Sequence, residues 1–524
     1  MNRQTNIHRL MLMAALLVFG GALLWAARPA GAATITVTTT ADENNSDGDC
    51  SLREAILAAN NDVAVDACLA GDGVDTITLP AGDYFFDVVP GASGEDLAVT
   101  GDLDIRESLT INGAGRVTTV VNANGVDRVF HILAGHVALN NVLITGGEAP
   151  VGEHGGGIYA HGGNLTLVNS QVSDNRAFGG ANQHGAGIYF GGNDAALTIV
   201  VTYIDNNLAS GAGGGVYVES SATLTLRDSS VHGNSAATGG GIHSQAAATI
   251  TGSTLSGNMT TSNPSGGAGM VSSGPLMMVN STLSGNAAVG SGGGLVVGSG
   301  SAAGLYNVTI TDNTANSDGD ITGDGGGIRI ALGAVSLSHT IIAGNRDNGA
   351  LGAIHPDCSG AFNSLDYNLI GDTTGCALSG QTAHTITGAP AGLQPLADNG
   401  GPTDTHALLL SSPAIDAGRP AGCRDHKGLP LTVDQRGYAR PVNGDKRPGS
   451  ACDIGAFERL SPGTPTPAPT ATATATASVT PTATPTATAT TPVEGPTATA
   501  TPSPTLTPPV DLDSWIYVPV TARD

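Results

Sequence analysis

The chain has 524 residues, of which 76 are glycine and 4% are aromatic. This composition is typical of a repetitive solenoid and disfavours the compact core of a globular enzyme. The formal net charge of −24 argues against nucleic acid or an anionic membrane surface as a binding partner.

The N-terminal segment, residues 1–32, has the pattern of a signal peptide. Basic Arg3 and Arg9 precede an apolar stretch of 16 residues at 10–25, and Ala30-Gly31-Ala32 suits signal peptidase cleavage. A retained membrane anchor is the alternative, but the apolar stretch is short for one. We expect cleavage, an extracellular or cell-surface location, and a mature chain without a transmembrane span.

Residues 33–75 are expected to form an N-terminal cap. Ser51 is a good N-cap residue for a helix. The apolar residues that follow it share one helical face: Leu52, Ala55, Ile56 and Ala59. This short helix would close the open end of the fold that follows.

An acidic turn before this helix has part of the spacing of a calcium-binding loop. Positions 1, 3, 5, 6 and 12 of that pattern are filled by Glu43, Asn45, Asp47, Gly48 and Glu54. Glu is unusual at the first position, and an acidic turn without a metal has the same appearance. Calcium is the one candidate cofactor, and the acidic turn is the preferred interpretation.

Residues 76–395 contain a repeat that occurs seven times. Each unit has apolar residues at offsets −7, −5 and 0, Ser or Thr at offset −2 in all but one unit, and Asn at offset +3. The asparagines are Asn175, Asn207, Asn234, Asn258, Asn286, Asn313 and Asn345. They are 24 to 32 residues apart, and a Gly-rich run ending in an apolar residue accompanies each unit. Such a period is typical of a stacked array.

The alternation at offsets −7 and −5 indicates strands, because every second side chain of a strand points to the same face. A helical solenoid would need longer apolar runs and fewer glycines. The repeat therefore predicts an all-β parallel β-helix, with three short strands per coil and about 4.8 Å between coils. In that fold each recurring Asn is expected to turn inward at a corner and bond the amide of the next coil.

Loop length varies on one side of this repeat. Segments from each Asn to the next Gly-run apolar residue span 8 to 15 residues, and variable loops on one face of a solenoid are where ligands usually bind. The longest, 314–327, carries Asp318, Asp320 and Asp324, and Arg329 follows. These four could imitate a calcium-dependent lyase or a paired-carboxylate hydrolase. No second acidic cluster stacks beside them, so an exposed acidic loop is preferred and they remain weak catalytic candidates.

His154 and His184 each lie four residues before the apolar end of a Gly run. They should stack one coil apart, near enough to share a metal ion. The next unit has Ala212 at this position, so such a site would have two protein ligands at most. Exposed loop histidines are the preferred interpretation.

The six cysteines form three pairs of near neighbours along the chain: Cys50 and Cys68, Cys358 and Cys376, and Cys423 and Cys452. Other pairings are open, but sequential disulfides are expected in an exported chain. No CxxC spacing occurs, which disfavours metal ligation by these thiols.

The end of the chain divides into three segments. Residues 396–460 are expected to form a C-terminal cap with structural salt bridges, whose charged members are Asp416, Asp434, Arg436, Arg440, Asp453 and Glu458. Residues 461–510 are rich in Thr, Pro and Ala and predict a disordered, extended stalk. Residues 511–524 form a short tail that is either a docking segment or a disordered end.

Two segments resemble signatures of bacterial secreted β-helix proteins. Within residues 34–60, Cys50-Ser51-Leu52-Arg53-Glu54-Ala55 resembles the CSLREA element. Residues 396–458 resemble the end of choice-of-anchor proteins, as in Ser412-Pro413-Ala414-Ile415-Asp416-Ala417-Gly418 and Asp453-Ile454-Gly455-Ala456-Phe457-Glu458. The repeats are similar to those of polymorphic outer-membrane proteins, with Val, Ile or Leu replacing a Phe. The resemblance implies a right-handed parallel β-helix of the pectin-lyase type, outside the cell or on its surface, with no agreed chemistry.

Two functions follow from these features. The preferred one is a non-enzymatic, monomeric scaffold for binding or adhesion, whose partner is a glycan or another surface protein. The alternative is a polysaccharide lyase or glycoside hydrolase on the same fold. A stacked acidic and basic cluster on adjacent coils would distinguish them, and the sequence does not show one.

Overall fold

The structure is a computed structural model of the whole chain. It describes residues 32–90, 95–262, 266–320, 323–349, 354–444 and 451–460. The expected signal peptide up to residue 31, the stalk and the tail lie outside these ranges. The described residues all belong to one compact unit, Met1–Thr470.

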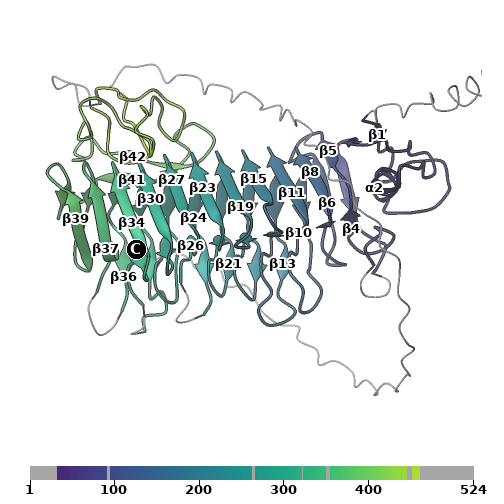
Figure 1. Cartoon of the computed structure of the whole chain (residues 1–524), viewed down its shortest axis with the longest axis horizontal. Helices are drawn as coiled ribbons and strands as arrows, with labels where there is room; N and C mark the ends of the chain where they lie inside the picture. The colour runs from purple at the N-terminus through teal and green to yellow at the C-terminus, as the bar shows by residue number, and fades with distance from the viewer. Residues whose placement is uncertain are drawn as a thin grey trace, which may run out of the picture. The chain divides into compact units, whose positions relative to one another are not determined.

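The described residues form a parallel β-helix in which each coil adds one strand to each of three sheets, and coils follow one another in chain order (Figure 1). Sheet 1 contains β4 (Leu103–Ile105), β7 (Phe130–Ile132), β10 (Ile158–His161), β14 (Ile188–Gly191), β18 (Val216–Val218), β22 (Ile242–Ser244), β26 (Met270–Ser272), β29 (Leu295–Val297) and β33 (Ile328–Ile330). Sheet 2 contains β1 (Thr34–Thr36), β2 (Asp75–Leu79), β5 (Leu109–Gly113), β8 (Gly135–Asn140), β11 (Gly163–Val168), β15 (Ala196–Val200), β19 (Thr223–Arg227), β23 (Ala247–Thr251), β27 (Leu276–Val279), β30 (Ala302–Tyr306), β34 (Ala334–Ser338), β37 (Cys358–Leu365) and β39 (Cys376–Gln381).

Sheet 3 completes each coil. It contains β3 (Gly82–Phe85), β6 (Thr119–Asn122), β9 (Leu143–Thr145), β12 (Gln171–Ser173), β16 (Tyr203–Asp205), β20 (Ser230–His232), β24 (Thr254–Ser256), β28 (Thr282–Ser284), β31 (Thr309–Thr311), β35 (Ile341–Ile342), β38 (Leu369–Ile370) and β40 (Ile386–Thr387). Short strands follow it at the next corner: β13 (Arg176–Ala177), β17 (Leu208–Ala209), β21 (Ser235–Ala236), β25 (Met259–Thr260), β32 (Thr314–Ala315) and β36 (Arg346–Asp347). The predicted all-β parallel coil is therefore confirmed, with a short fourth strand added in several coils.

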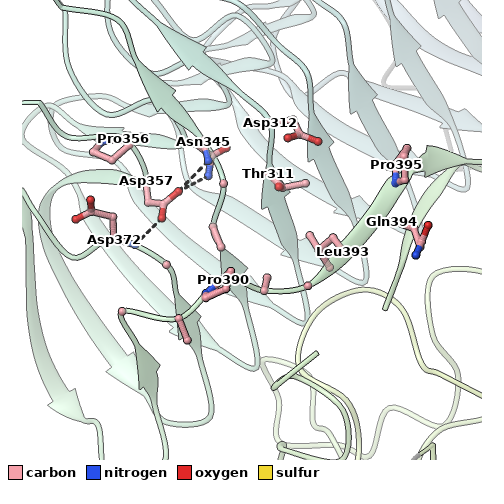
Figure 2. Close-up of a pocket in the computed structure, with 17 residues that line it drawn as sticks. Thr311, Asp312, Asn345, Pro356, Asp357, Asp372, Pro390, Leu393, Gln394 and Pro395 are labelled. Atoms are coloured by element: carbon pink, nitrogen blue, oxygen red, sulfur yellow. Dashed lines mark hydrogen bonds between the residues drawn. The ribbon is translucent and has the colours of Figure 1, made fainter. Parts of the chain in front are cut away.

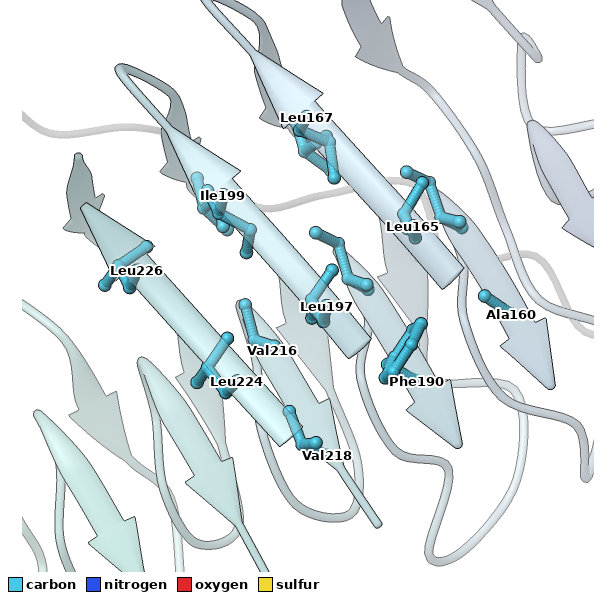
Figure 3. Packing of buried hydrophobic residues seen from close by; sticks show 14 of the residues in the cluster. Ala160, Leu165, Leu167, Phe190, Leu197, Ile199, Val216, Val218, Leu224 and Leu226 are labelled. Carbon is cyan, nitrogen blue, oxygen red and sulfur yellow. The ribbon is translucent and has the colours of Figure 1, made fainter. Parts of the chain in front are cut away.

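The core lies between the inner faces of the sheets. Leu165 on β11 is in register with Leu197 on β15 and Leu224 on β19, and all three are buried. Figure 3 shows these ladders facing side chains of sheet 1 such as Phe190 and Val216. Because each buried side chain contacts its equivalent in the next coil, the apolar offsets of the repeat become continuous ladders.

The recurring asparagines lie at the corner after sheet 3 and are buried. The side-chain nitrogen of Asn234 donates to Asn258 Oδ1 at 3.0 Å and to the carbonyl of Ile204 at 2.9 Å. Its own Oδ1 accepts from the backbone and side-chain nitrogens of Asn207 at 3.0 and 2.9 Å. The same pattern runs from Asn207 to Asn313; Asn175 begins the ladder by donating to Asn207, and Asn345 accepts from Asn313. The amides thus form a ladder that bonds each coil to the next.

The ladder ends on a carboxylate. Asp357, just before β37, accepts from the backbone and side-chain nitrogens of Asn345 at 3.0 and 2.9 Å. Its second oxygen accepts from the backbone nitrogen of Asp372 at 2.7 Å. A carboxylate only accepts hydrogen bonds, so Asp357 meets the last donating amide and offers no donor to a further coil.

The Gly runs approach this ladder closely. A β-carbon at Gly241 would lie 2.6 Å from the carbonyl oxygen of Gly269 and 3.0 Å from the side chain of Asn258. Any larger residue would push the neighbouring coil away.

A second ladder of hydroxyl groups lies at the corner between sheets 2 and 3. The backbone nitrogen of Thr202 donates to Ser229 Oγ at 3.1 Å, and that of Ser229 donates to Ser253 Oγ at 3.2 Å. These hydroxyl groups explain the Ser or Thr at offset −2, because they satisfy buried backbone donors where the chain turns.

The helix α2 (Leu52–Asn61) begins at Ser51, whose Oγ accepts from the backbone nitrogen of Glu54, while Glu54 accepts from the backbone nitrogen of Ser51. The predicted apolar face is buried in the solenoid core. Strand β1 precedes the helix and pairs with β2, so sheet 2 already begins within the segment expected to be only a cap.

The C-terminal segment differs from the cap expected at 396–460. It lies against the outer face of sheet 3, where Thr254 Oγ1 donates to the carbonyl of Asp404 and Ala456 donates to Thr309 Oγ1. Its antiparallel strands are β41 (Leu393–Ala397) and β42 (Thr405–Leu408). The physical reason is that sheet 3 turns apolar on its outer face here, so that Ile341 and Leu369 pack with residues of the segment such as Phe457. It therefore covers the side of the coils.

Three disulfides join the expected pairs: Cys50–Cys68, Cys358–Cys376 and Cys423–Cys452. These bonds are compatible with an extracellular protein. Among the described residues, no helix has the length and apolar character needed to cross a bilayer.

Candidate functional site

The outer faces of the sheets differ in their chemistry. In sheet 2 one outward row reads, in register, Thr110, Ala138, Thr166, Thr198, Thr225, Thr249, Met277, Gly304 and Ser336. In sheet 1 the equivalent row reads Asp104, His131, Tyr159, Tyr189, Tyr217, His243, Val271, Val296, Arg329 and Ser359. Ionisable and aromatic groups are thus concentrated on sheet 1, which is bordered by the variable loops.

Four rings form an aromatic row along this face: Tyr159, Tyr189, Tyr217 and His243. Their centroids are 5.1, 5.2 and 5.4 Å apart, and adjacent rings are nearly parallel. The spacing follows from the coil repeat, since equivalent side chains stack one coil apart. Stacking covers the ring faces, and Tyr189 and Tyr217 are only 7% and 8% exposed. Tyr159 and His243, at the two ends of the row, are half-buried.

Polar partners fix the tyrosine hydroxyl groups. Tyr189 donates to Glu219 Oε1 at 2.5 Å, and Tyr217 accepts from Gln245 Nε2 at 2.8 Å. Burial and the adjacent Glu219 raise the pKa of Tyr189, so its hydroxyl stays a donor. Glu219 also lies 3.4 Å from His161 Nε2. The row therefore has a carboxylate and an imidazole at its edge.

His154 and His184 stack one coil apart, with centroids separated by 4.9 Å. They also stack on Tyr189 and Tyr217, so they widen the aromatic row. The Nδ1 atom of His154 accepts from the backbone of His184, and that of His184 accepts from the backbone of Ala212. Burial and the neighbouring His154 lower the pKa of His184 to about 4. Face-to-face rings do not direct their remaining nitrogens at one point, so a shared metal ion does not fit.

The longest loop brings only part of the predicted catalytic set together. Asp324 forms an ion pair with Arg329 and accepts from Ser359 Oγ at 2.5 Å. His355 Nδ1 bonds the other oxygen of Asp324. Asp318 instead accepts from the backbone of Asp320 within the loop.

Asp324 lies between Ser359 and His355, so the imidazole does not contact the hydroxyl group. A nucleophilic Ser needs its base within hydrogen-bond reach, and this order does not provide one. Sequence reasoning missed Ser359 and His355 because they come from the next coil. Only the strand register, which pairs Arg329 with Ser359, brings them near.

The structure does not assemble the calcium-loop pattern as the sequence spaces it. Both carboxylate oxygens of Glu54 accept backbone hydrogen bonds, from Asn45 at 2.9 Å and Ser51 at 3.0 Å. The helix cap thus uses the residue that should be the bidentate ligand. Glu43 and Asp47 lie together with Asp49, and desolvation and these neighbouring charges raise the pKa of Glu43. The donor set expected from the sequence therefore does not fit calcium.

A groove of about 710 Å³ lies at the corner after sheet 3 (Figure 2). Asp357 is buried in its wall, while Asp312 and Asp372 are exposed. Burial raises the pKa of Asp357, whose oxygens are occupied by the ladder bonds. No Arg, Lys or His belongs to the described residues that line this groove. Its chemistry is structural, and it lies apart from the aromatic row.

One comparison with known protein families agrees with the architecture. The family described as the right handed beta helix region matches residues 186–355. Among solved structures, the chain is similar to the crystal structure of pectate lyase Pel9A, at 15% sequence identity over 82% of this chain and 98% of that chain, with a TM-score of 0.38. No curated protein matches the chain. The fold is the right-handed parallel β-helix expected from the sequence, whereas the resemblance to CSLREA and choice-of-anchor proteins stays a prediction.

Proposed function

We propose that the protein is an exported, non-enzymatic β-helix that binds glycan chains along the outer face of sheet 1. The observation that carries this proposal is the contrast between the two outward rows. The row on sheet 2 presents mainly small and hydroxyl side chains, with Met277 as the exception, whereas the row on sheet 1 presents stacked rings with carboxylate and imidazole groups beside them.

This arrangement suits an extended polar polymer. A chain lying along the aromatic row would follow rings spaced 5.1 to 5.4 Å apart between centroids, with its main contacts at the half-buried Tyr159 and His243. Hydroxyl, carboxylate and imidazole groups are donors and acceptors for sugar hydroxyls. The flanking loops vary in length from coil to coil, which allows different contacts at each position.

Binding is tested with the full mature chain on an immobilised panel of neutral and acidic polysaccharides, followed by calorimetry on any that bind. We expect Tyr159→Ala, at the less covered end of the row, to weaken binding about tenfold. Tyr189→Phe keeps the stacked ring and should weaken binding less. Tyr203→Phe, on the outer face of sheet 3, is the matched control and should not change it. Equal affinity in all variants would contradict this proposal.

The alternative, a polysaccharide lyase or hydrolase, is favoured by the contact between Asp324 and Arg329. The same panel, followed for new reducing ends and unsaturated products with and without Ca²⁺, distinguishes the two functions. We expect no product. Product that is lost in Asp324→Asn would establish the enzyme and locate its centre.

A further inference from the structure

Three ligand-type side chains meet at the N-terminal end of the sheet 1 row. Asp104 on β4 is in register with His131 on β7, and Asp96 comes from the loop before β4. His131 Nδ1 lies 3.0 Å from Asp104 Oδ1 and 3.6 Å from Asp96 Oδ1. One donor atom from each residue falls within 4.8 Å of the other two. This cluster has no part in the repeat or in the ring stacking of Tyr189 and Tyr217.

Two of these donors are buried without a hydrogen-bond partner. Asp104 is 0% exposed and His131 is 8% exposed, yet Asp104 Oδ1 and His131 Nδ1 make no hydrogen bond. They are close enough for one but lack its geometry. A buried polar atom without a partner is costly, and a buried carboxylate oxygen especially so. The two atoms lie 3.0 Å apart, and one cation that accepts the lone pairs of both would satisfy both.

The surrounding bonds hold the cluster in place. The other oxygen of Asp104 accepts from the backbone of Ala98 at 2.8 Å, which ties the loop to β4. The carbonyl of Ala98 in turn accepts from Arg53 of the cap helix at 3.1 Å. Ala98 has a φ of 59°, a conformation that costs energy for a residue with a side chain. The loop is thus fixed in a strained form that brings Asp96 to the other two ligands.

The separations match ligands that share one cation. Donors at right angles around an ion with bonds of about 2.1 Å lie about 3 Å apart. One imidazole nitrogen with two carboxylate oxygens suits zinc or manganese, whereas calcium prefers oxygen donors alone. The side chain of Asp96 is 56% exposed, so the solvent side remains open for water or a further ligand.

We propose that Asp96, Asp104 and His131 bind a divalent transition-metal ion of the zinc and manganese class. The ion would join the loop at 95–100 to the first coils of sheet 1. It would lie beside the aromatic row, because the ring of His131 packs edge-on against Tyr159 at 5.2 Å. The proposal of this metal site does not depend on the proposed binding of glycans.

The test is calorimetric titration of the metal-stripped full mature chain with Zn²⁺, Mn²⁺ and Ca²⁺, with elemental analysis after dialysis. We expect one Zn²⁺ or Mn²⁺ per chain, weak or absent Ca²⁺ binding, and a thermal midpoint that rises on adding Zn²⁺. Asp96→Asn should weaken Zn²⁺ binding at least about tenfold and abolish the rise. Asp96 is exposed, so the Asp96→Asn variant should fold. His131→Gln provides a second variant of the site.

The control is the double variant His154→Gln with His184→Gln, which removes the other clustered histidines. It should bind Zn²⁺ like the wild type. Loss of binding in this control, binding unchanged by Asp96→Asn and His131→Gln, or no binding of Zn²⁺ and Mn²⁺ by the wild type would each overturn the assignment. Glycan affinity is measured separately, so its outcome does not decide the metal site.

Discussion

Each ladder asparagine within the stack bonds both the preceding and the following coil. Asn234 accepts from Asn207 and donates to the carbonyl of Ile204 in the preceding coil, and it donates to Asn258 in the next. A hydrogen bond adds little net stability, but a buried group left without one costs about 1 to 3 kcal/mol. The residue is therefore expected to matter through the partners that it would leave unsatisfied.

Replacing Asn234 by Ala leaves the backbone nitrogen of Asn207 and the carbonyl of Ile204 without these partners. We expect the local free energy of unfolding to fall by at least about 2 kcal/mol. Native-state hydrogen exchange of amides in β20 and β24 measures this change. Asn193→Ala, the same substitution on an exposed turn, should leave it unaltered. Equal effects of the two variants would show that the ladder does not stabilise the coils.

The aromatic row contains a titratable ring. Burial, with a smaller contribution from His184, lowers the pKa of His243 from 6.5 to about 4. Between these values the unfolded chain binds a proton that the folded chain does not, so this residue destabilises the fold as the pH falls. His243→Phe keeps a ring and removes the proton uptake. As the pH falls through that window, the free energy of unfolding of the variant should rise relative to that of the wild type by on the order of 2 kcal/mol.

Urea denaturation at several pH values measures this difference. Tyr217→Phe is the control, because the phenol does not titrate in the same window and its substitution should shift stability by an amount independent of pH. A difference between His243→Phe and the wild type that stays constant with pH would be the contrary result.

The sequence predicts the role of residues that recur in every unit, but not that of residues that occur in a single coil. Asn234 has a fixed offset from the apolar positions of its unit, so its ladder can be read from the period. Asp357 lies 12 residues after Asn345, far from the repeat spacing, and enters the ladder through a loop. Asp104 and His131 lie before the seven regular units, and only the register of β4 and β7 places them side by side.

At the scale of elements, the corner between sheets 2 and 3 sets a backbone requirement. Residues there have positive φ and are Asn, Asp or Gly in most coils, such as Asn169, Asp228 and Gly252. Val201 occupies the same corner with a φ of 50°. A β-branched side chain is strained in this left-handed region, whereas Asn and Gly tolerate it.

Val201→Asn should therefore stabilise the protein by about 1 kcal/mol, since it removes strain without removing a buried contact. The measurement is the thermal midpoint of the full mature chain. Val200→Asn is the matched control, because the neighbouring valine is in strand β15 and Asn disfavours a strand. A decrease in stability for Val201→Asn would contradict the inference that the backbone at Val201 is strained.

The C-terminal segment is attached to sheet 3 by a buried arginine. Arg440 Nε lies 3.0 Å from Glu458, and Nη1 donates to Asn280 of the solenoid at 3.0 Å. Removing one partner of a buried ion pair leaves the other charge uncompensated. The sequence predicted a structural salt bridge here but not its place, because the outward positions Ile341 and Leu369, which pack against the segment, do not belong to the pattern of the repeat.

Arg440→Met should reduce the stability of the segment by about 3 kcal/mol. Limited proteolysis is expected to cut residues 396–460 faster while the coils of sheets 1 and 2 remain intact. Lys427→Met removes an exposed positive charge from the same segment and should not change the rate. Proteolysis of Arg440→Met at the wild-type rate would exclude this anchoring role.

At the scale of the whole molecule, each coil bonds only its neighbours, so stability is local along the stack. Disulfides lie near both ends of the described solenoid. Cys50–Cys68 adjoins α2, and Cys358–Cys376 joins β37 to β39. The side chains of β39 are largely exposed, so its attachment depends on this bond and on strand pairing.

Replacing both Cys358 and Cys376 by Ser should unfold the last coil without affecting the central ones. Hydrogen exchange is expected to lose protection in β37 and β39 while β19 and β23 keep theirs. Protection lost across all strands would instead indicate a single cooperative unit.

The direction of the asparagine ladder gives the stack a polarity. In the bonds between successive asparagines, every side-chain nitrogen donates toward the later coil, and the last one donates to the carboxylate of Asp357. An extra coil that carries Asn could be inserted before Asp357 without changing the direction of these hydrogen bonds. Beyond Asp357 no donor continues the column. The column of amide-bonded coils therefore ends at one acidic residue, and a unit duplicated upstream of that residue would lengthen the column in the same order.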